Sequence, residues 1–442
     1  MTGTQTLAAR GALGVIGATA TVLAGRYRLL PSAQRVSWNR IFLLLFGLSR
    51  LLVFGLLFGV LHVDPRGDIP AYYFPEATRI LAGQRPYLDF VTSYAPLHAY
   101  LDAAALRLHN APHSIILLAI AFELALMAVW SAIPERYLGE DLRRQALTLY
   151  LVNPLSVLFV TVDGQDNVLI ALFFALAVYV LLKQKTALSG VAFALSVCAV
   201  KFLALLYVPL FIVVVRRWWL WALTFVATMT AVYGVFIAVG ANVLIPLGVE
   251  GDYRGAGCIP FVIETFLGRL LRSAIWDALT ALAVIAVAGA LFVFAQRALR
   301  GVDAERTRSA QLFLLVHGAT AVTMAVLLLS KKSWSTYVLL ALYPICLTVL
   351  QSKRIYTWGF AVFLFVAAVE HSFWSSILGQ PTAVELHALL LKGNRNALEL
   401  MVLEILLLAG YAMLLGLSLR RLTELGQRVA RHTVGQPIEV RG

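Results

Sequence analysis

Long apolar stretches alternate with short polar segments over most of the chain. A helix that crosses the hydrocarbon core of a membrane needs about 20 apolar residues. By that measure the pattern predicts spans at residues 41–62, 114–132, 145–161, 167–182, 187–200, 202–215, 218–240, 276–296, 310–330, 336–350, 355–373 and 397–417. We therefore expect an all-α polytopic membrane protein with about 12 transmembrane helices, or 13 with an earlier stretch.

Two parts of the pattern depart from regular spans. Residues 11–25 form a short apolar run rich in Gly, Ala and Thr, so an uncleaved signal-like segment, an in-plane helix and a thirteenth span all remain open. Residues 1–40 are therefore treated as an N-terminal cytoplasmic or in-plane segment. The stretches 187–200 and 202–215 are each too short for a full crossing. Their junction, Lys201, is expected below the outer membrane surface, in a cavity.

The distribution of cations gives the expected orientation. Lys and Arg are enriched in cytoplasmic loops of membrane proteins. Alternating the spans places most cations on one side, in the basic stretch 26–40, in later loops that include Arg300, and in the tail 418–442. The membrane domain is then 41–417, and its long extracytoplasmic loops are 63–112, 241–275 and 374–396. The first loop mixes charged, Pro and aromatic residues, which favours a structured loop with two short surface helices.

Composition excludes several classes of protein. The chain has 442 residues, of which 60% are hydrophobic and 13% charged, and this balance excludes an ordinary soluble enzyme. The net charge of +13 is explained by cytoplasmic loops, so no nucleic-acid partner is expected. The cysteines Cys198, Cys258 and Cys346 are far apart, without a CxxC motif, which excludes a zinc site and a disulfide scaffold. No Asn-x-Ser/Thr acceptor occurs, which is compatible with a bacterial plasma membrane.

Candidate chemistry gathers at the predicted extracytoplasmic ends of the spans. A charged side chain within a span costs about 2.5 to 3.5 kcal/mol, so charges outside the cytoplasmic loops need a reason. The acids at these ends are Asp64, Asp68, Asp163, Asp166, Glu250, Asp252 and Glu264, and the cations are Lys201, Arg254, Lys331 and Lys332. Carboxylates that face cations at one membrane surface suit a base acting beside a bound anion.

Each of these residues also has a simpler interpretation. Asp68 precedes Pro70 and fits either a helix N-cap or a general base, and the two roles are compatible. The run 161–167, with Gln165 and Asp166, fits a polar turn. Lys201 fits either snorkelling to the interface or a phosphate contact. Arg254 fits solvation in a loop, whereas two outer cations at 331–332 oppose the positive-inside trend and favour a functional interpretation.

Charged and polar residues inside the spans have a default explanation. Interhelical pairing is expected for Arg50, Glu123, Glu370 and Glu404. His317 also lies within a span, and it is in addition a candidate donor to the site.

Several motifs, taken in order, carry a family resemblance. Asp68-x-x-x-Tyr72, Gly83-Gln84-Arg85-Pro86-Tyr87 and Ser93-Tyr94-Ala95-Pro96-Leu97 resemble the first luminal loop of GT-C glycosyltransferases. Asn153-Pro154-Leu155 with Asp163-Gly164-Gln165-Asp166-Asn167, the Lys201 segment, and Lys331-x-x-x-x-x-Tyr337 with Tyr343-Pro344 are similar to later segments of the same proteins. The likeness covers residues 40 to about 350. It is closest to glycosyltransferase family 87, which contains mycobacterial polyprenyl-phosphate-mannose-dependent mannosyltransferases, and it extends to the first mannosyltransferase of GPI-anchor synthesis.

The sequence departs from the family pattern at two points. The proline that follows the family lysine is displaced to Pro209, and the Y-P-P-L form reads Tyr94-Ala95-Pro96-Leu97. These departures leave the subgroup and the sugar open.

The resemblance implies a GT-C fold and the inverting transfer of a sugar from a polyprenyl-phosphate donor to a glycolipid or glycan hydroxyl at the extracytoplasmic face. Mannose is the first candidate for this sugar. Asp68 is the expected base, because a single displacement needs a base at the acceptor hydroxyl. The expected phosphate and substrate contacts are Lys201, Lys331, Lys332, Arg254, Tyr72, Gln165, Asp166, Tyr337 and His317. Such cations stabilise a leaving phosphate, so no obligatory metal or other cofactor is expected. Asp163 and Asp166 are nevertheless carboxylates that could bind a metal ion.

Two other functions fit the class of protein. A transporter or flippase of a lipid-linked or anionic solute would have polar groups near the midplane and repeat symmetry, whereas these groups gather at one surface. A structural subunit of a partner enzyme predicts that Asp68 is dispensable.

Overall fold

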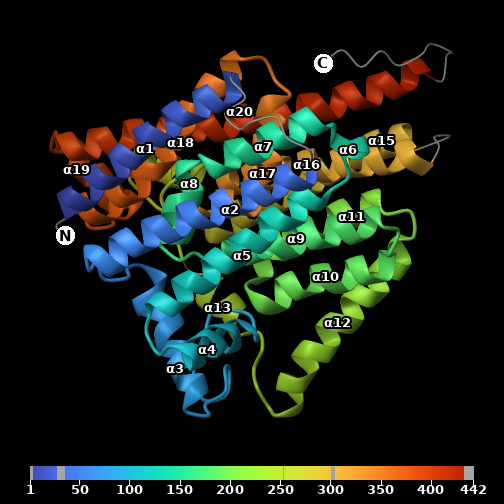
Figure 1. The fold of residues 1–442 in the computed structure, drawn as a ribbon. Coiled ribbons are helices and arrows are strands. Elements are labelled where there is room, and N and C mark those ends of the chain that lie inside the picture. Colours follow the sequence, from blue (N-terminus) through green and yellow to red (C-terminus); the bar gives the residue numbers. More distant parts are fainter. Residues whose placement is uncertain (1–2, 27–34, 252, 300–303, 433–442) are drawn as a thin grey trace.

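A computed structural model describes residues 3–26, 35–251, 253–299 and 304–432. For residues 35–36, 297–299, 304–306 and 425–432 it describes the backbone alone. Asp252, Arg300 and most of the basic stretch 26–40, named above, lie outside what is described. Figure 1 shows the long helices roughly aligned along one direction, with α3 and α4 gathered at one corner and α12 leaning away from the bundle.

Eight helices in the described residues are long and apolar enough to cross a membrane. They are α1 (Gly3–Arg26), α2 (Arg35–Phe54) continued by η1 (Gly55–Val60), α5 (His113–Ala132), α12 (Trp218–Ala238), α15 (Ser273–Leu299), α16 (Ala304–Leu329), α18 (Ile355–Ser372) continued by η6 (Phe373–Ile377), and α20 (Arg395–His432).

A ninth candidate is a bent pair, α7 (Glu140–Leu151) with α8 (Pro154–Ser156) and η3 (Val157–Val162), which meet at 48°. The bend lies at Asn153-Pro154, where proline lacks the N–H that would continue the helix. Shorter apolar helices are α9 (Asn167–Leu182), α10 (Thr186–Ala199), η4 (Phe202–Tyr207) with α11 (Val208–Val214), and η5 (Ser335–Ala341) with α17 (Leu342–Leu350). Every predicted span is thus helical, which confirms an all-α protein of multi-pass membrane character.

Helix α1 packs antiparallel along the whole of α18. Gly3 lies against Ser376, Gly14 against Phe365 and Gly25 against Thr357, so the small residues of α1 allow close approach over its full length. Because the two helices are antiparallel neighbours, α1 has the same inclination to a membrane as α18. Of the interpretations left open for residues 11–25, this packing favours a further span.

Helix α20 extends beyond the predicted span. The apolar stretch ends near residue 417, but the helix continues to His432, so most of the basic segment 418–442 is helical in the described part. Leu422 is fully buried in this extension, and Arg420 and Arg421 each pair with Glu424. The helix continues because an apolar position still packs on the bundle and the exposed charges pair at helical spacing.

Exposed apolar side chains cover the outer helices, whereas α16 is enclosed by the bundle. On α12, Leu223 and Val235 are more than half exposed, and Leu282 and Ile285 on α15 are similarly exposed. Continuous apolar surfaces of this kind are rare on soluble monomers and are what a lipid-facing helix presents.

The polar loops meet at one end of the bundle. They contain η2 (Ile69–Tyr73), α3 (Phe74–Leu81), α4 (His98–Leu108), α13 (Ile245–Gly251), α14 (Ile259–Leu267) and α19 (Ala383–Leu391), while α6 (Glu135–Leu138) follows α5. The backbone N–H of Ala95 donates to the carbonyl of Val200 at 2.9 Å, and that of Gly255 to Lys331 at 2.9 Å. The loops that the cation pattern assigned to one side are therefore in mutual contact.

Candidate functional site

Lys201 lies where α10 ends and the backbone becomes extended before η4. The first loop closes over this break, because Ala95 and Leu97 donate their backbone N–H groups to the carbonyls of Val200 and Cys198 at 2.9 and 3.0 Å. The loop thereby satisfies carbonyls that the end of α10 leaves without helical partners. It also places Tyr94 beneath Lys201, with the Nζ atom 4.5 Å from the ring centre.

The Lys201 ammonium is buried and lacks a close carboxylate. The residue is 8% exposed, and no Asp or Glu oxygen in the described part of the chain lies within the 4.0 Å of an ion pair. Asp166, Tyr337 and Glu250 interact with it electrostatically from farther away. Burial of this degree argues against simple snorkelling. A desolvated ammonium without a contact partner would bind an incoming anion strongly.

The Asp68 carboxylate contacts the turn before α9 rather than the backbone of its own helix. Asp68 occupies the N-cap position of η2, as one interpretation of the sequence expects, but its side chain accepts no capping hydrogen bond. Its Oδ2 atom instead accepts from Gln165 Nε2 at 3.0 Å and from the Tyr73 hydroxyl at 3.5 Å. Gly164 permits this approach, since a Cβ there would lie 2.4 Å from Ile69.

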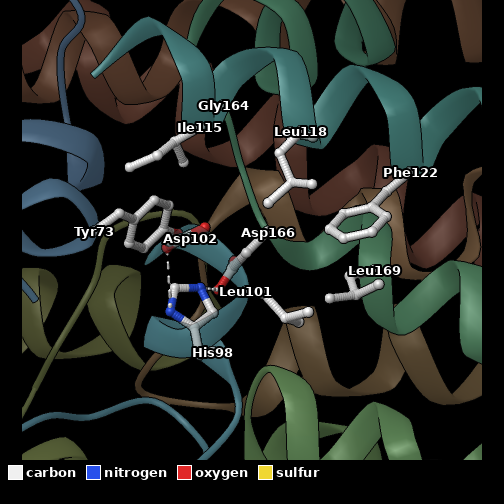
Figure 2. A pocket seen from close by; sticks show the side chains of 11 residues that line it. Tyr73, His98, Leu101, Asp102, Ile115, Leu118, Phe122, Gly164, Asp166 and Leu169 are labelled. Atoms are coloured by element: carbon white, nitrogen blue, oxygen red, sulfur yellow. Dashed lines mark ion pairs between the residues drawn. The ribbon is translucent and has the colours of Figure 1, made fainter. Parts of the chain in front are cut away.

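His98 is a site residue that sequence reasoning missed. It lies on α4, stacked on the Tyr94 ring at a centroid distance of 4.3 Å. Its Nε2 atom is 3.1 Å from Asp166 Oδ2 and its Nδ1 atom is 3.6 Å from Asp102 Oδ2 (Figure 2). The spacing of His98 and Asp102 at i and i+4 could have indicated that they interact on one face of a helix. No feature of the sequence links either of them to Asp166.

The three groups shift one another's pKa values. Burial raises the pKa of Asp102 to about 7, although the His98 charge opposes this. Burial alone would lower the pKa of His98, but the charge of Asp102 and the contact with Asp166 outweigh it and raise that pKa. Burial would raise the pKa of Asp166, but Lys201 and His98 outweigh it and lower that pKa. The two neighbouring acids therefore favour the protonated form of His98.

Further candidates line the same end of the bundle. Lys332 Nζ is 2.5 Å from Glu250 Oε2 and 5.3 Å from the centre of the Tyr253 ring. Tyr72 is 40% exposed and its hydroxyl interacts with that of Tyr253. Tyr337 is buried and interacts electrostatically with Lys201 and Asp68. The structure thus gathers Asp68, Lys201, Lys332, Tyr72, Gln165, Asp166 and Tyr337 in one region.

Lys331 and Arg254, like Lys332, are paired with carboxylates. Lys331 Nζ pairs with Asp277 at 2.8 Å on α15. Arg254 donates to both carboxylate oxygens of Glu264, at 2.5 and 2.6 Å, and also to the Leu271 carbonyl. Lys201 therefore differs from these three cations in having no carboxylate within ion-pair distance in the described residues.

His317 lies in another part of the bundle. Its ring nitrogens are each 3.0 Å from an oxygen, one on Thr348 and one on Gln351. It is about 18 Å along α16 from the loop that holds Lys331 and Lys332, at 1.5 Å per residue. His317 lies on the face of α16 that packs against the end of α17. A uniformly apolar stretch does not show from its hydropathy which face of the helix a residue occupies.

Arg50 and Glu123 pair between spans, as expected. Arg50 Nε is 3.1 Å from Glu123 Oε2, and Tyr150 and Ser156 donate to the other oxygen of Glu123. Glu404 on α20 instead accepts from the backbone N–H of Gly257 at 2.7 Å and lies within electrostatic reach of Glu370 on α18.

Within the described residues, no group of three His, Cys, Asp or Glu side chains is arranged to hold a metal ion. No protein-family model matches the chain, and no curated protein matches it.

Proposed function

We propose that the protein is a membrane glycosyltransferase of the GT-C type that moves a sugar from a polyprenyl-phosphate donor to a hydroxyl of a glycolipid or glycan. Mannose is the first candidate for this sugar. The reaction takes place at the extracytoplasmic face of a bacterial plasma membrane, among membrane lipids and without nucleic acid. The observation that carries the proposal is the buried Lys201 ammonium, free of any close carboxylate in the described chain, in the same region as the Asp68 carboxylate.

A single displacement accounts for both groups. The acceptor hydroxyl attacks the anomeric carbon of the donor, and Asp68 takes its proton. The bond between the anomeric carbon and the phosphate oxygen breaks, and its electron pair leaves with the polyprenyl phosphate. Lys201, with Lys332 farther out, stabilises the negative charge that develops there. The configuration at the anomeric carbon inverts, and the step requires no obligatory metal.

The surroundings of Asp68 suit a base. Gln165 and Tyr73 both contact Oδ2, which leaves Oδ1 without a protein partner in the described structure and available to a substrate hydroxyl. The exposed rings of Tyr72 and Tyr253 offer a surface beside it for a sugar. The exposed apolar faces of α12 and α15 supply lipid-facing surface for a polyprenyl chain.

The test of the base is Asp68→Asn in purified, reconstituted protein with polyprenyl-phosphate-mannose and a lipid extract as acceptor. We expect transfer to fall about 100-fold or more, the range for loss of a general base. Asp64→Asn is the matched control, because Asp64 is an exposed acid of the same loop, and its activity should be unchanged. Lys201→Gln should lose transfer, whereas Lys185→Gln, an exposed lysine between α9 and α10, should not.

Full activity of Asp68→Asn would overturn the assignment of Asp68 as the base. If wild-type protein transfers no sugar from any polyprenyl-phosphate donor yet moves such a lipid between leaflets, the protein is a flippase or transporter.

A further inference from the structure

The cluster formed by His98, Asp102 and Asp166, here called the acid–imidazole triad, has no part in the displacement described above. His98 and Asp102 come from α4, and Asp166 from the turn before α9. Their exposed fractions are 3%, 5% and 9%. The imidazole lies between the two carboxylates, 3.1 Å from one and 3.6 Å from the other.

The triad borders a small cavity. His98 Nδ1, Asp102 Oδ2 and both carboxylate oxygens of Asp166 are buried without a hydrogen bond of good geometry in the described structure. Figure 2 shows these groups on one side of the cavity and apolar side chains, among them Leu118 and Phe122, on the other. Buried polar atoms with so few partners make the ionisation state of the cluster sensitive to a single proton.

The net charge of the triad depends on one proton. With His98 as imidazolium and Asp166 ionised, the triad is neutral when Asp102 is protonated and carries one negative charge when Asp102 is ionised. The charged groups that face it from other elements are Glu76 on α3 and Lys201 at the end of α10. The phenols of Tyr73 and Tyr94 also pack on His98, while α5 and α9 contribute apolar side chains to the cavity.

The triad interacts with the proposed phosphate site through Asp166. Asp166 is within electrostatic reach of Lys201, and His98 balances its charge. While that balance holds, the Lys201 ammonium has no fully available counter-charge in the protein. An additional negative charge on Asp102 would offset Lys201 and repel an anionic ligand.

We propose that the acid–imidazole triad sets the charge beside Lys201 and thereby controls how strongly the site binds the phosphodiester of its donor. His98 and Asp102 are then positioning residues that act through Asp166. This inference rests on the proposed function, since it needs Lys201 to be the phosphate contact. The pKa of Asp102, raised by burial to about 7, places the change of charge near neutral pH.

The probe for this inference is farnesyl methyl phosphate, a phosphodiester whose single negative charge does not change near neutral pH. Its affinity for the full chain in nanodiscs is measured by calorimetry at pH 6 and pH 8. We expect wild-type protein to bind about fivefold more weakly at pH 8, the effect of one added charge in a partly screened site. Asp102→Asn should show a smaller difference between the two pH values than the wild type, because Asp166 alone then favours the protonated form of His98, and His98→Gln should bind weakly at both.

Two further variants separate the possible failures. His109→Gln changes an exposed histidine just beyond the C-terminal end of α4 and should keep the wild-type pH dependence. Lys201→Gln should abolish binding, and if it binds like wild type, or if wild type binds at neither pH, the proposed phosphate site fails and the inference with it. If Lys201→Gln loses binding but Asp102→Asn keeps the wild-type pH dependence, only the role of the triad is overturned. Asn is nearly isosteric with protonated Asp, so the Asp102→Asn variant should fold.

Discussion

Buried charges in this protein follow two different arrangements. Arg50 and Glu123 neutralise each other within the span region at 3.1 Å, and hydrogen bonds from Tyr150 and Ser156 complete the network. Lys201 has no such partner in the described chain and instead lies over an aromatic ring. The first arrangement stabilises the bundle, whereas the second keeps a charge available.

The Arg50 network gives a prediction about stability. Glu123→Gln leaves the Arg50 guanidinium buried without its counter-charge, and breaking one side of such a pair costs about 3 to 5 kcal/mol. We expect a large fall in the thermal unfolding midpoint in detergent. The double variant Arg50→Met/Glu123→Met should recover much of this loss, since both desolvated charges are gone, and a double variant no more stable than Glu123→Gln would contradict the pairing.

Asp102 gives a prediction about pH. Its folded-state pKa of about 7 lies above the ordinary value of 3.8, so the folded protein holds a proton that the unfolded chain releases. The resulting stabilisation is fully present below the ordinary pKa and is lost as the pH rises through about 7. The shift in the pKa of His98 is also upward, so it acts with the same sign.

We therefore expect the unfolding midpoint of the wild type to fall between pH 5 and pH 8 and that of Asp102→Asn to change less. Over this range the contribution of Asp102 to the free energy of unfolding falls by up to about 3 kcal/mol. Asp89→Asn is the control, because this acid of the same loop is exposed and pairs with Arg85, so its removal should leave the slope unchanged above pH 5. Parallel slopes for wild type and Asp102→Asn would show that Asp102 is ionised throughout.

At the scale of elements, glycines determine how closely helices approach. On α10, a Cβ at Gly190 would lie 2.4 Å from the backbone carbonyl of Trp221 on α12, a distance that backbone atoms cannot relieve without moving the helix. On α12 itself, a Cβ at Gly234 would meet open space. The contact of α10 with α12 therefore depends on one missing side chain.

Gly190→Ala should lower the free energy of unfolding by about 1 to 3 kcal/mol, the usual cost of overpacking. Gly234→Ala is the matched control in a helix interior and should be neutral or stabilising by up to about 1 kcal/mol, because alanine favours the helix. Chemical or thermal denaturation of both variants in the same detergent measures the difference. Equal effects of the two substitutions would show that α10 and α12 pack less closely than described.

At the scale of the whole molecule, hydropathy predicted much of the fold because each span has to be apolar along its length. It could not place α1, since a short Gly- and Ala-rich run is compatible with several positions and only its packing against α18 distinguishes them. Lys201 was predictable as a buried junction because both flanking stretches are short. The ion pairs of Lys331 and Arg254 were not predictable, because their partners, Asp277 and Glu264, are brought to them only by tertiary contacts.

The orientation of the whole bundle can be tested with its cysteines. Cys198, Cys258 and Cys346 are all buried, so they give little background with a membrane-impermeant maleimide. We expect His109→Cys, in the same loop as the candidate site, to be labelled in intact cells, and Lys185→Cys to be labelled only after permeabilisation. Both positions are exposed. The reverse pattern would place the site in the cytoplasm and exclude the proposed extracytoplasmic reaction.

The docking of the first loop onto the end of α10 has a consequence for biosynthesis. The N–H groups of Ala95 and Leu97 bind carbonyls of residues made much later by the ribosome, and Lys332 follows later still. In the proposed orientation the loop crosses the membrane, with Asp68 on it, before the later segments are made. A nascent chain halted before Lys201 would carry Asp68 without the Lys201 ammonium, so the proposed site would be complete only late in translation.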